Sequence, residues 1–138
     1  NTNSIAVAFI ADSKVVTNKV KIFIFPTEGA KIRCAIYKQE SNVLSLVTQT
    51  QLYTGQTLLA GVPFETVVTL DSDSLYFFVV GSSSSDSTFL GKRINADLMT
   101  GFLYQGEAFN AGSDTFKSQY PTDGHVTGNV FVPYFKII

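Results

Sequence analysis

Apolar residues recur at every second position through most of the first half of the chain, which is the pattern of strands with one buried face. In KVKIFIF (19–25), isoleucine and valine alternate with lysine and phenylalanine. KIRCAIY (31–37) repeats the alternation, and PTEGA (26–30) between them has the proline and glycine of a hairpin connection. The two segments are therefore predicted to form a pair of neighbouring strands.

Three later segments extend the strand pattern. LSLVTQTQLY (44–53) and FETVVTL (64–70) alternate, and their Val and Thr residues favour a pleated, half-buried surface. SLYFFVVG (74–81) is instead continuously apolar, rich in aromatic and β-branched residues, and too short for a comfortable helix. It predicts a central strand that is buried on both faces.

The second half of the chain is less regular. NADLMT (95–100) is the only stretch that resembles a helical turn, and it is too short to form a helix by itself. NVFVPYFKII (129–138) alternates well, but Pro133 has no N–H to donate to a strand ladder. This proline favours an edge strand or a bulge.

Short strands, frequent turn residues and no helix beyond a turn predict an all-β fold. We expect one domain over residues 1–138, an antiparallel two-sheet sandwich with jelly-roll-like topology. An immunoglobulin-like or fibronectin-like sandwich is the alternative, weakened by the absence of tryptophan and of a cysteine pair. Because the chain begins with Asn1 rather than Met, we expect a domain excised from a longer protein.

The charge balance argues against several kinds of partner. Ten basic and eleven acidic residues are scattered along the chain, giving a net charge of −1. Nucleic-acid binding is not expected without a strong basic footprint. No stretch approaches the roughly 18–20 continuous apolar residues of a membrane-spanning helix, so membrane insertion is not expected. Abundant uncharged polar residues are typical of extracellular or virion-surface proteins, and this is the expected location.

The only cysteine is Cys34, which excludes an intramolecular disulfide. It shares the alternating face of Ile32 and Ile36. Because a free cysteine on an apolar face is usually a small buried hydrophobe, we do not expect it to be a nucleophile.

Residues 31–80 carry a recognisable succession of strands: AIY, a polar turn, LVTQT, a glycine loop, FETVVTL, an Asp/Ser turn and LYFFVV. This succession resembles sandwich domains of extracellular and viral fibre proteins. In style the whole chain is similar to the receptor-binding tip domains of bacteriophage tail fibres and baseplates. The resemblance implies a jelly-roll-like framework that presents loops to carbohydrate or another surface ligand, and it transfers no functional residue.

Catalytic and metal motifs are weak. His125 is the only histidine and there is no G-x-S-x-G elbow, so an enzyme is not expected. DSDS (71–74) lacks the further ligands of a calcium loop and predicts a turn in which Asp and Ser bond backbone amides. We expect no cofactor and no metal site, with calcium at DSDS as the alternative.

Carbohydrate recognition needs exposed aromatic faces and neighbouring polar groups. Tyrosine and phenylalanine in glycine-bordered segments could supply the aromatic faces, although each of these side chains could equally be buried in the core. Tyr120 precedes Pro121 and is the aromatic residue most expected to be exposed. His125 is interpreted first as a turn residue and second as a ligand contact whose charge is set by Asp123. The predicted ligand-binding residues are Tyr104, Phe116, Tyr120, Asp123 and His125.

Two functions are carried forward. The first is a non-catalytic domain that recognises glycans or a host-surface receptor at the tip of a viral fibre or surface assembly. The second is a structural or oligomerisation domain of a fibre or adhesin, whose apolar strands IAVAFI (5–10) and NVFVPYFKII pack against copies of themselves, most simply as a trimer. A carbohydrate-binding module appended to a glycoside hydrolase is a remote third reading.

Overall fold

The structure is a computed structural model of the chain, and it describes residues 4–25, 29, 31–54, 61–82, 88–89, 91–95, 103–106, 116–121 and 129–138. These residues form strands and turns and contain no helix. The strands are β1 (Ser4–Phe9), β2 (Val15–Ile22), β3 (Ile24–Phe25), β4 (Lys31–Glu40), β5 (Val43–Gln49), β6 (Tyr53–Thr54), β7 (Val62–Leu70), β8 (Tyr76–Ser82), β9 (Thr88–Phe89), β10 (Gly91–Asn95), β11 (Leu103–Gly106), β12 (Gln119–Pro121), β13 (Asn129–Pro133) and β14 (Phe135–Ile137).

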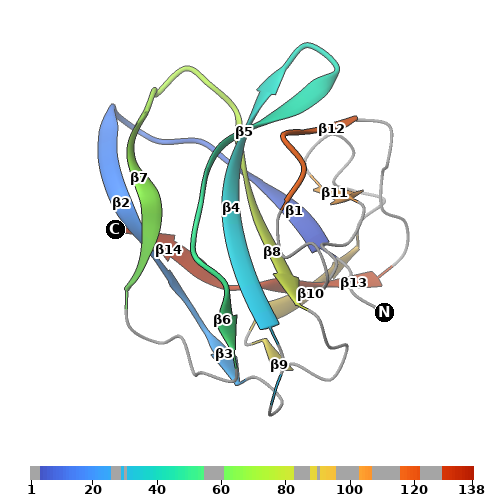
Figure 1. Cartoon of the computed structure of the whole chain (residues 1–138). Helices are drawn as coiled ribbons and strands as arrows, with labels where there is room; N and C mark the ends of the chain where they lie inside the picture. The colour runs from blue at the N-terminus through green and yellow to red at the C-terminus, as the bar shows by residue number, and fades with distance from the viewer. Residues whose placement is uncertain are drawn as a thin grey trace.

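Two antiparallel sheets pack against each other (Figure 1). The large sheet has the strand order β11-β1-β8-β4-β5-β12, with β6 also paired to β4. The small sheet has the order β14-β2-β7. Two further pairs, β10-β13 and β3-β9, complete the described strands. The predicted all-β, two-sheet sandwich is therefore confirmed.

The strand pairs of the two sheets are nested within one another. In the large sheet β1 pairs with β8, and in the small sheet β2 pairs with β7. The chain passes from the large sheet to the small one between β1 and β2 and again between β6 and β7, and it returns to the large sheet between β2 and β4 and between β7 and β8. The β1-β8 and β2-β7 pairs are therefore nested. This arrangement lets an antiparallel chain form two facing layers with short connections.

The core between the sheets is made by alternating residues from both layers. Val20 and Ile22 of β2 are at most 1% exposed, as are Ile32 and Cys34 of β4. Phe78 of β8 belongs to the same cluster. Because successive side chains of a strand point to opposite faces, the predicted face shared by Cys34 and its isoleucine neighbours is confirmed.

A second core covers the outer face of the large sheet. It contains Tyr37, Phe77 and Val79 from the sheet, together with Phe116 and Tyr120 from the C-terminal third. Residues of β8 therefore alternate between the two cores, and Tyr76 through Val80 are all buried. The prediction that SLYFFVVG is a central strand buried on both faces is confirmed, since β8 lies between β1 and β4.

Two expectations about neighbouring strands are wrong. KVKIFIF and KIRCAIY do not pair, because β2 belongs to the small sheet and β4 to the large one. Their apolar faces meet across the sandwich instead of side by side. IAVAFI is also no exposed strand, because β1 is paired with β11 on one side and β8 on the other. Pro133 does lie at the end of a strand whose described partner is β10 alone, which fits the expected edge position.

Candidate functional site

Of the predicted ligand-binding residues that the structure describes, Phe116 and Tyr120 lie together and the backbone of Tyr104 lies apart from them. Phe116 and Tyr120 are described completely, whereas Asp123 and His125 lie outside the described residues. Tyr104 lies on β11 opposite Ala6, at one edge of the large sheet. Tyr120 lies on β12 at the other edge, with β1, β8, β4 and β5 between them. Aromatic residues at opposite edges of one sheet cannot stack on the same sugar ring.

Phe116 and Tyr120 are anchors rather than exposed platforms. They are 3% and 6% exposed, and both rings contact Tyr37 edge-on, with centroids 6.4 Å and 5.3 Å from its ring. The expected exposure of Tyr120 is wrong. The residue before Pro121 is extended, as predicted, but this extended segment pairs with β5 and places Tyr120 opposite the buried Leu44. Opposed residues of an antiparallel pair share a face, so the ring turns into the core.

Residues 116–121 are clamped to the large sheet between these two anchors. The Tyr37 hydroxyl donates a hydrogen bond to the carbonyl of Lys117. The Leu46 amide donates to the carbonyl of Ser118 over 2.8 Å. Between the buried rings, the side chains of residues 117–119 are exposed. We call residues 117–119 (Lys, Ser and Gln) the polar tripeptide.

The polar tripeptide places a cation, a hydroxyl and an amide on a fixed backbone, and it immediately precedes the segment that carries Asp123 and His125. The sequence pattern indicated Gln119 only as a polar neighbour of the candidate aromatic residues, and it did not single out Lys117 or Ser118. The signal was present in the spacing: two aromatics four residues apart enclose three polar residues. Two buried aromatic side chains with exposed polar residues between them are typical of a surface segment that is held in place at both ends.

The tyrosine at the base of this segment stays protonated. Burial raises the pKa of the Tyr37 hydroxyl far above its ordinary value, and the neighbouring Tyr120 raises it further. The neutral hydroxyl donates to the Lys117 carbonyl. Tyr37 is therefore a structural donor and not an acid–base group.

The buried thiol of Cys34 is equally inert. It is 1% exposed, and burial raises its pKa far above the ordinary value. Because the thiolate is the nucleophilic form, a thiol that resists ionisation is a poor nucleophile. The prediction that Cys34 is a buried hydrophobe is confirmed.

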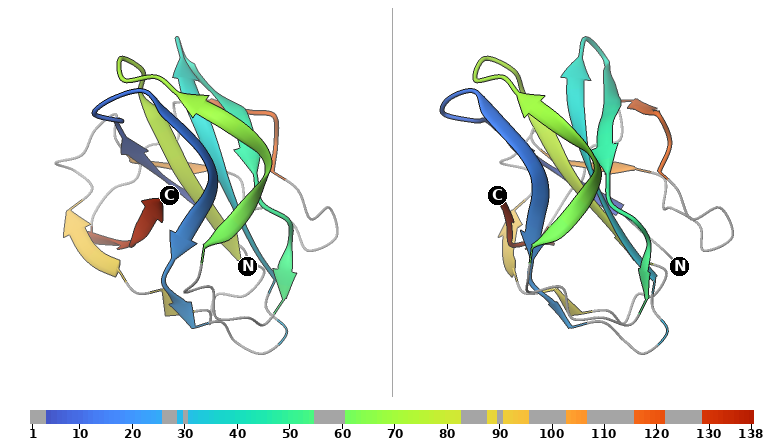
Figure 2. Two further views of the ribbon diagram at one scale, coloured as in Figure 1. Left: turned by 90° about the vertical axis from the view of Figure 1, so that its left-hand side faces the viewer. Right: turned by 60° about the vertical axis from the view of Figure 1, so that its left-hand side comes forward.

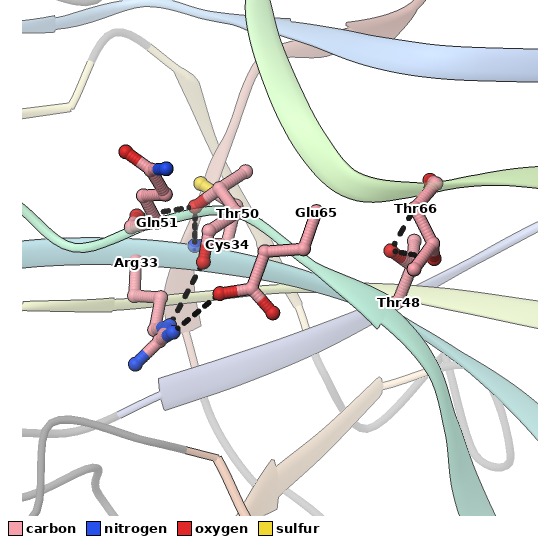
Figure 3. A network of polar contacts seen from close by, with 7 residues as sticks. All are labelled: Arg33, Cys34, Thr48, Thr50, Gln51, Glu65 and Thr66. Atoms are coloured by element: carbon pink, nitrogen blue, oxygen red, sulfur yellow. Dashed lines mark hydrogen bonds and ion pairs between the residues drawn. The ribbon is translucent and has the colours of Figure 1, made fainter.

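The main polar network lies where the two sheets meet at β5 and β7 (Figure 3). Arg33 donates through Nε to the carbonyl of Thr50 over 2.9 Å and through a terminal nitrogen to Glu65 over 3.0 Å. Thr50, fully buried, accepts a hydrogen bond from the Cys34 amide at Oγ1 and donates from the same hydroxyl to the Gln51 carbonyl. These contacts tie β4, the end of β5 and β7 together.

A large irregularity in β7 makes this contact between the sheets. Thr17 of β2 pairs with Val68 and Lys19 with Pro63, so Asn18 stands against residues 64–67 of β7. The displaced part of β7 turns to β5, where Phe64 bridges Thr50. Bulges of this kind bend a strand and re-aim its side chains. The polar network therefore helps to join the large sheet to the small sheet along β5 and β7.

The described residues give little support for a metal-binding or catalytic site. They contain no group of three or more His, Cys, Asp and Glu side chains arranged to hold a metal ion. DSDS forms a turn, as predicted, but the acceptor for the amide of Asp71 is the hydroxyl of Tyr76, at 2.8 Å, and not an Asp or Ser side chain of the turn. The best candidate for a functional surface in the described chain is the polar tripeptide.

Comparison with known proteins gives no family. No protein-family model, no curated protein and no solved structure matches the chain. Within the described residues there is also no helix long and apolar enough to cross a membrane.

Proposed function

We propose that the chain is a non-catalytic binding domain that recognises glycans or a host-surface receptor. In this proposal the polar tripeptide and the following segment with Asp123 and His125 form the contact surface. The observation that carries it is the anchored presentation of residues 117–119 between two buried aromatic rings. Binding residues are often found on surface segments that a rigid framework holds in place.

The chemistry of the tripeptide suits a hydroxyl-rich ligand. Lys117 and Gln119 offer donors and an acceptor, and Ser118 offers a hydroxyl that donates and accepts. Because Phe116 and Tyr120 fix both ends of the tripeptide, little backbone entropy is lost when a ligand binds. An extracellular or virion-surface location, as expected from the composition, would bring such a surface into contact with cell-surface sugars.

The test is a glycan array followed by titration of the best ligand. The double variant Lys117→Ala/Gln119→Ala is expected to weaken binding about tenfold, the loss of one to two exposed polar contacts. The matched control, Lys14→Ala/Gln51→Ala, changes two exposed residues of the same types elsewhere and is expected to bind like the original chain. Equal affinity of the two double variants would remove the tripeptide from the site. No binding to any glycan or host cell would count against the function itself.

A structural or oligomerisation domain is the second candidate. The observation in its favour is a set of exposed large apolar side chains: Ile10, Val16, Val67, Tyr134 and Ile138. The β1 part of IAVAFI offers no free strand edge for such packing, because β1 is an interior strand of the large sheet, and only Ile10, just after β1, is in the exposed set. Light scattering across a range of concentrations separates the candidates, since a trimer of a fibre must persist on dilution whereas a monomeric binding domain has no such requirement.

A further inference from the structure

The small sheet presents three lysines on its outer face. Lys19 and Lys21 alternate along β2 with Val20 and Ile22, which are buried. Lys136 lies between two residues of β14 that pack against the core. Side chains alternate across a strand, so all three lysines point away from the sandwich interior. Figure 2 shows that no strand passes in front of this face of β2 and β7.

The three lysines lie close together. Lys136 stands directly opposite Lys21 in the β14-β2 pair. Lys19 and Lys21 are two residues apart on one strand, a separation of about 7 Å. Like charges placed opposite each other destabilise a sheet, and no ion pair joins any of the three to a carboxylate in the described part of the chain. Glu65, on the exposed side of β7, is already paired with Arg33.

Apolar contacts hold two of the lysines in place. The ammonium of Lys21 lies 5.5 Å from the centre of the Phe23 ring. The stem of Lys19 packs beside Gly61 and Ile138, since a Cβ built on Gly61 would lie 3.4 Å from Lys19 Cδ and 3.3 Å from Ile138 Cδ1. The amide of Ile138 also donates to the carbonyl of Lys19. These contacts restrict the side chains of Lys19 and Lys21 before a ligand binds, which lowers the entropic cost of binding.

We propose that this lysine face, Lys19, Lys21 and Lys136, binds an acidic saccharide through its carboxylate or sulfate groups. Charge complementarity carries the proposal: three clustered cations, which no carboxylate of the described residues pairs with, lie on a rigid sheet and are matched by a chain of closely spaced anions. The choice of a saccharide rests on the proposed function, and the lysine face would be a second contact surface on a different sheet from the polar tripeptide.

Other occupants fit the face less well. A second copy of the chain bound to this face through a two-fold axis would place the same lysines near one another, which opposes that association. Duplex nucleic acid is held by more phosphate contacts than three lysines provide, and the net charge of −1 adds no attraction. Basic segments that recognise anionic lipid surfaces contain four to eight basic residues.

The test measures affinity for a dextran sulfate oligosaccharide and for unsulfated dextran of the same length, at about 50 mM salt where screening is weak. We expect binding of the sulfated chain only. Lys21→Gln/Lys136→Gln is expected to weaken it about tenfold, as the loss of two exposed charge contacts. Lys14→Gln/Lys38→Gln removes the same charge elsewhere and is expected to leave it unchanged, and Lys21→Arg/Lys136→Arg is expected to retain it.

The outcomes separate this inference from the proposed function. Equal affinities of the two Gln variants, or equal binding of both dextrans, would overturn the proposal for the lysine face. The proposed function would still stand if the array identified a glycan whose binding is weakened in the Lys117→Ala/Gln119→Ala variant. Equal or tighter binding of a short DNA duplex, or of vesicles containing phosphatidylserine, through the same lysines would overturn the saccharide assignment. A chain that binds no glycan at all would overturn both. Thermal unfolding of each variant checks that the fold is intact.

Discussion

The outer faces of the two sheets differ sharply, although both sheets share one inner core. On the large sheet, Tyr37, Phe77 and Val79 point outward, are at most 2% exposed and belong to one buried cluster with Phe116 and Tyr120. On the small sheet, Val16 and Val67 are each 65% exposed. One sheet is thus the middle layer of the molecule, whereas the other is a surface layer.

The sequences of the strands differ in the same way. β8 reads as an unbroken apolar run because both of its faces are buried, whereas β2 and β7 alternate because one face meets water. The outer face of the large sheet also carries two glutamines. Gln39 lies opposite Leu44 and Gln49 opposite Ala35 on that face, and the side-chain oxygens of both glutamines are buried with no hydrogen-bond partner among the described residues. Unpaired buried acceptors cost stability, so these two glutamines are expected to weaken the outer face of the sheet.

The largest expected effect tests whether the outer face of the large sheet is a true core. Phe77 and Phe78 are neighbours with fully buried side chains that belong to opposite cores. Each change to alanine, Phe77→Ala and Phe78→Ala, is expected to lower the free energy of unfolding by about 3–5 kcal/mol, measured by urea denaturation. A loss below about 1 kcal/mol for Phe77→Ala alone would show that the outer cluster contributes little to folding.

A smaller effect is expected at the junction of the two sheets. Thr50→Val leaves the Cys34 amide without its buried acceptor and should cost about 1–3 kcal/mol. Thr48→Val also removes a hydroxyl, but the hydrogen-bond partner here is the hydroxyl of Thr66. Because Thr66 is exposed, water can replace the lost hydrogen bond. The cost of Thr48→Val is expected to stay below about 1 kcal/mol. Equal losses in the two variants would mean that burial of the partner does not matter.

Alkaline pH should weaken both cores in turn. Burial raises the pKa of Cys34 in the inner core and of Tyr37 in the outer core. As the pH rises, the unfolded chain therefore loses these protons at a lower pH than the folded chain does. Stability is then complete below the unfolded pKa values, about 8.5 for Cys and 10 for Tyr, and falls above each by about 1.4 kcal/mol per pH unit per group. Urea denaturation between pH 8 and 11 measures this decline. Cys34→Ala should remove the earlier component and Tyr37→Phe the later one, and an unchanged profile in both variants would contradict the assignment.

The smallest effect is expected on the exposed face of the small sheet. Val16→Thr and Val67→Thr keep β-branched side chains while replacing a methyl group with a hydroxyl, and each should change the free energy of unfolding by no more than about 0.5 kcal/mol. The same Val→Thr change at Val79, on the covered face of the large sheet, should cost more than about 1 kcal/mol. If Val16→Thr were as damaging as Val79→Thr, another surface would have to cover the small sheet in solution.

Local pattern was sufficient for much of the fold and for little of the site. The alternation around Cys34, the unbroken run of β8 and the turn at DSDS were each predictable, because they depend on periods of two and on residues that favour turns. Tyr120 was placed on the wrong side because its exposure depends on which strand lies beside it. Its neighbour is β5, which precedes it by about 70 residues in the sequence, and no local rule reports that pairing.

The sequence by itself determined that the chain is an all-β sandwich, which residues of each strand share a face, and which strand is buried on both faces. Only the tertiary structure decided which strands are neighbours, as when β2 and β4 face each other across the core rather than pairing. It also decided that Phe116 and Tyr120 anchor a polar tripeptide and that Lys21 of β2 meets Lys136 of β14. The physical reason is that side-chain alternation is a property of one strand, whereas a surface is made by strands distant in the chain, brought together by burial.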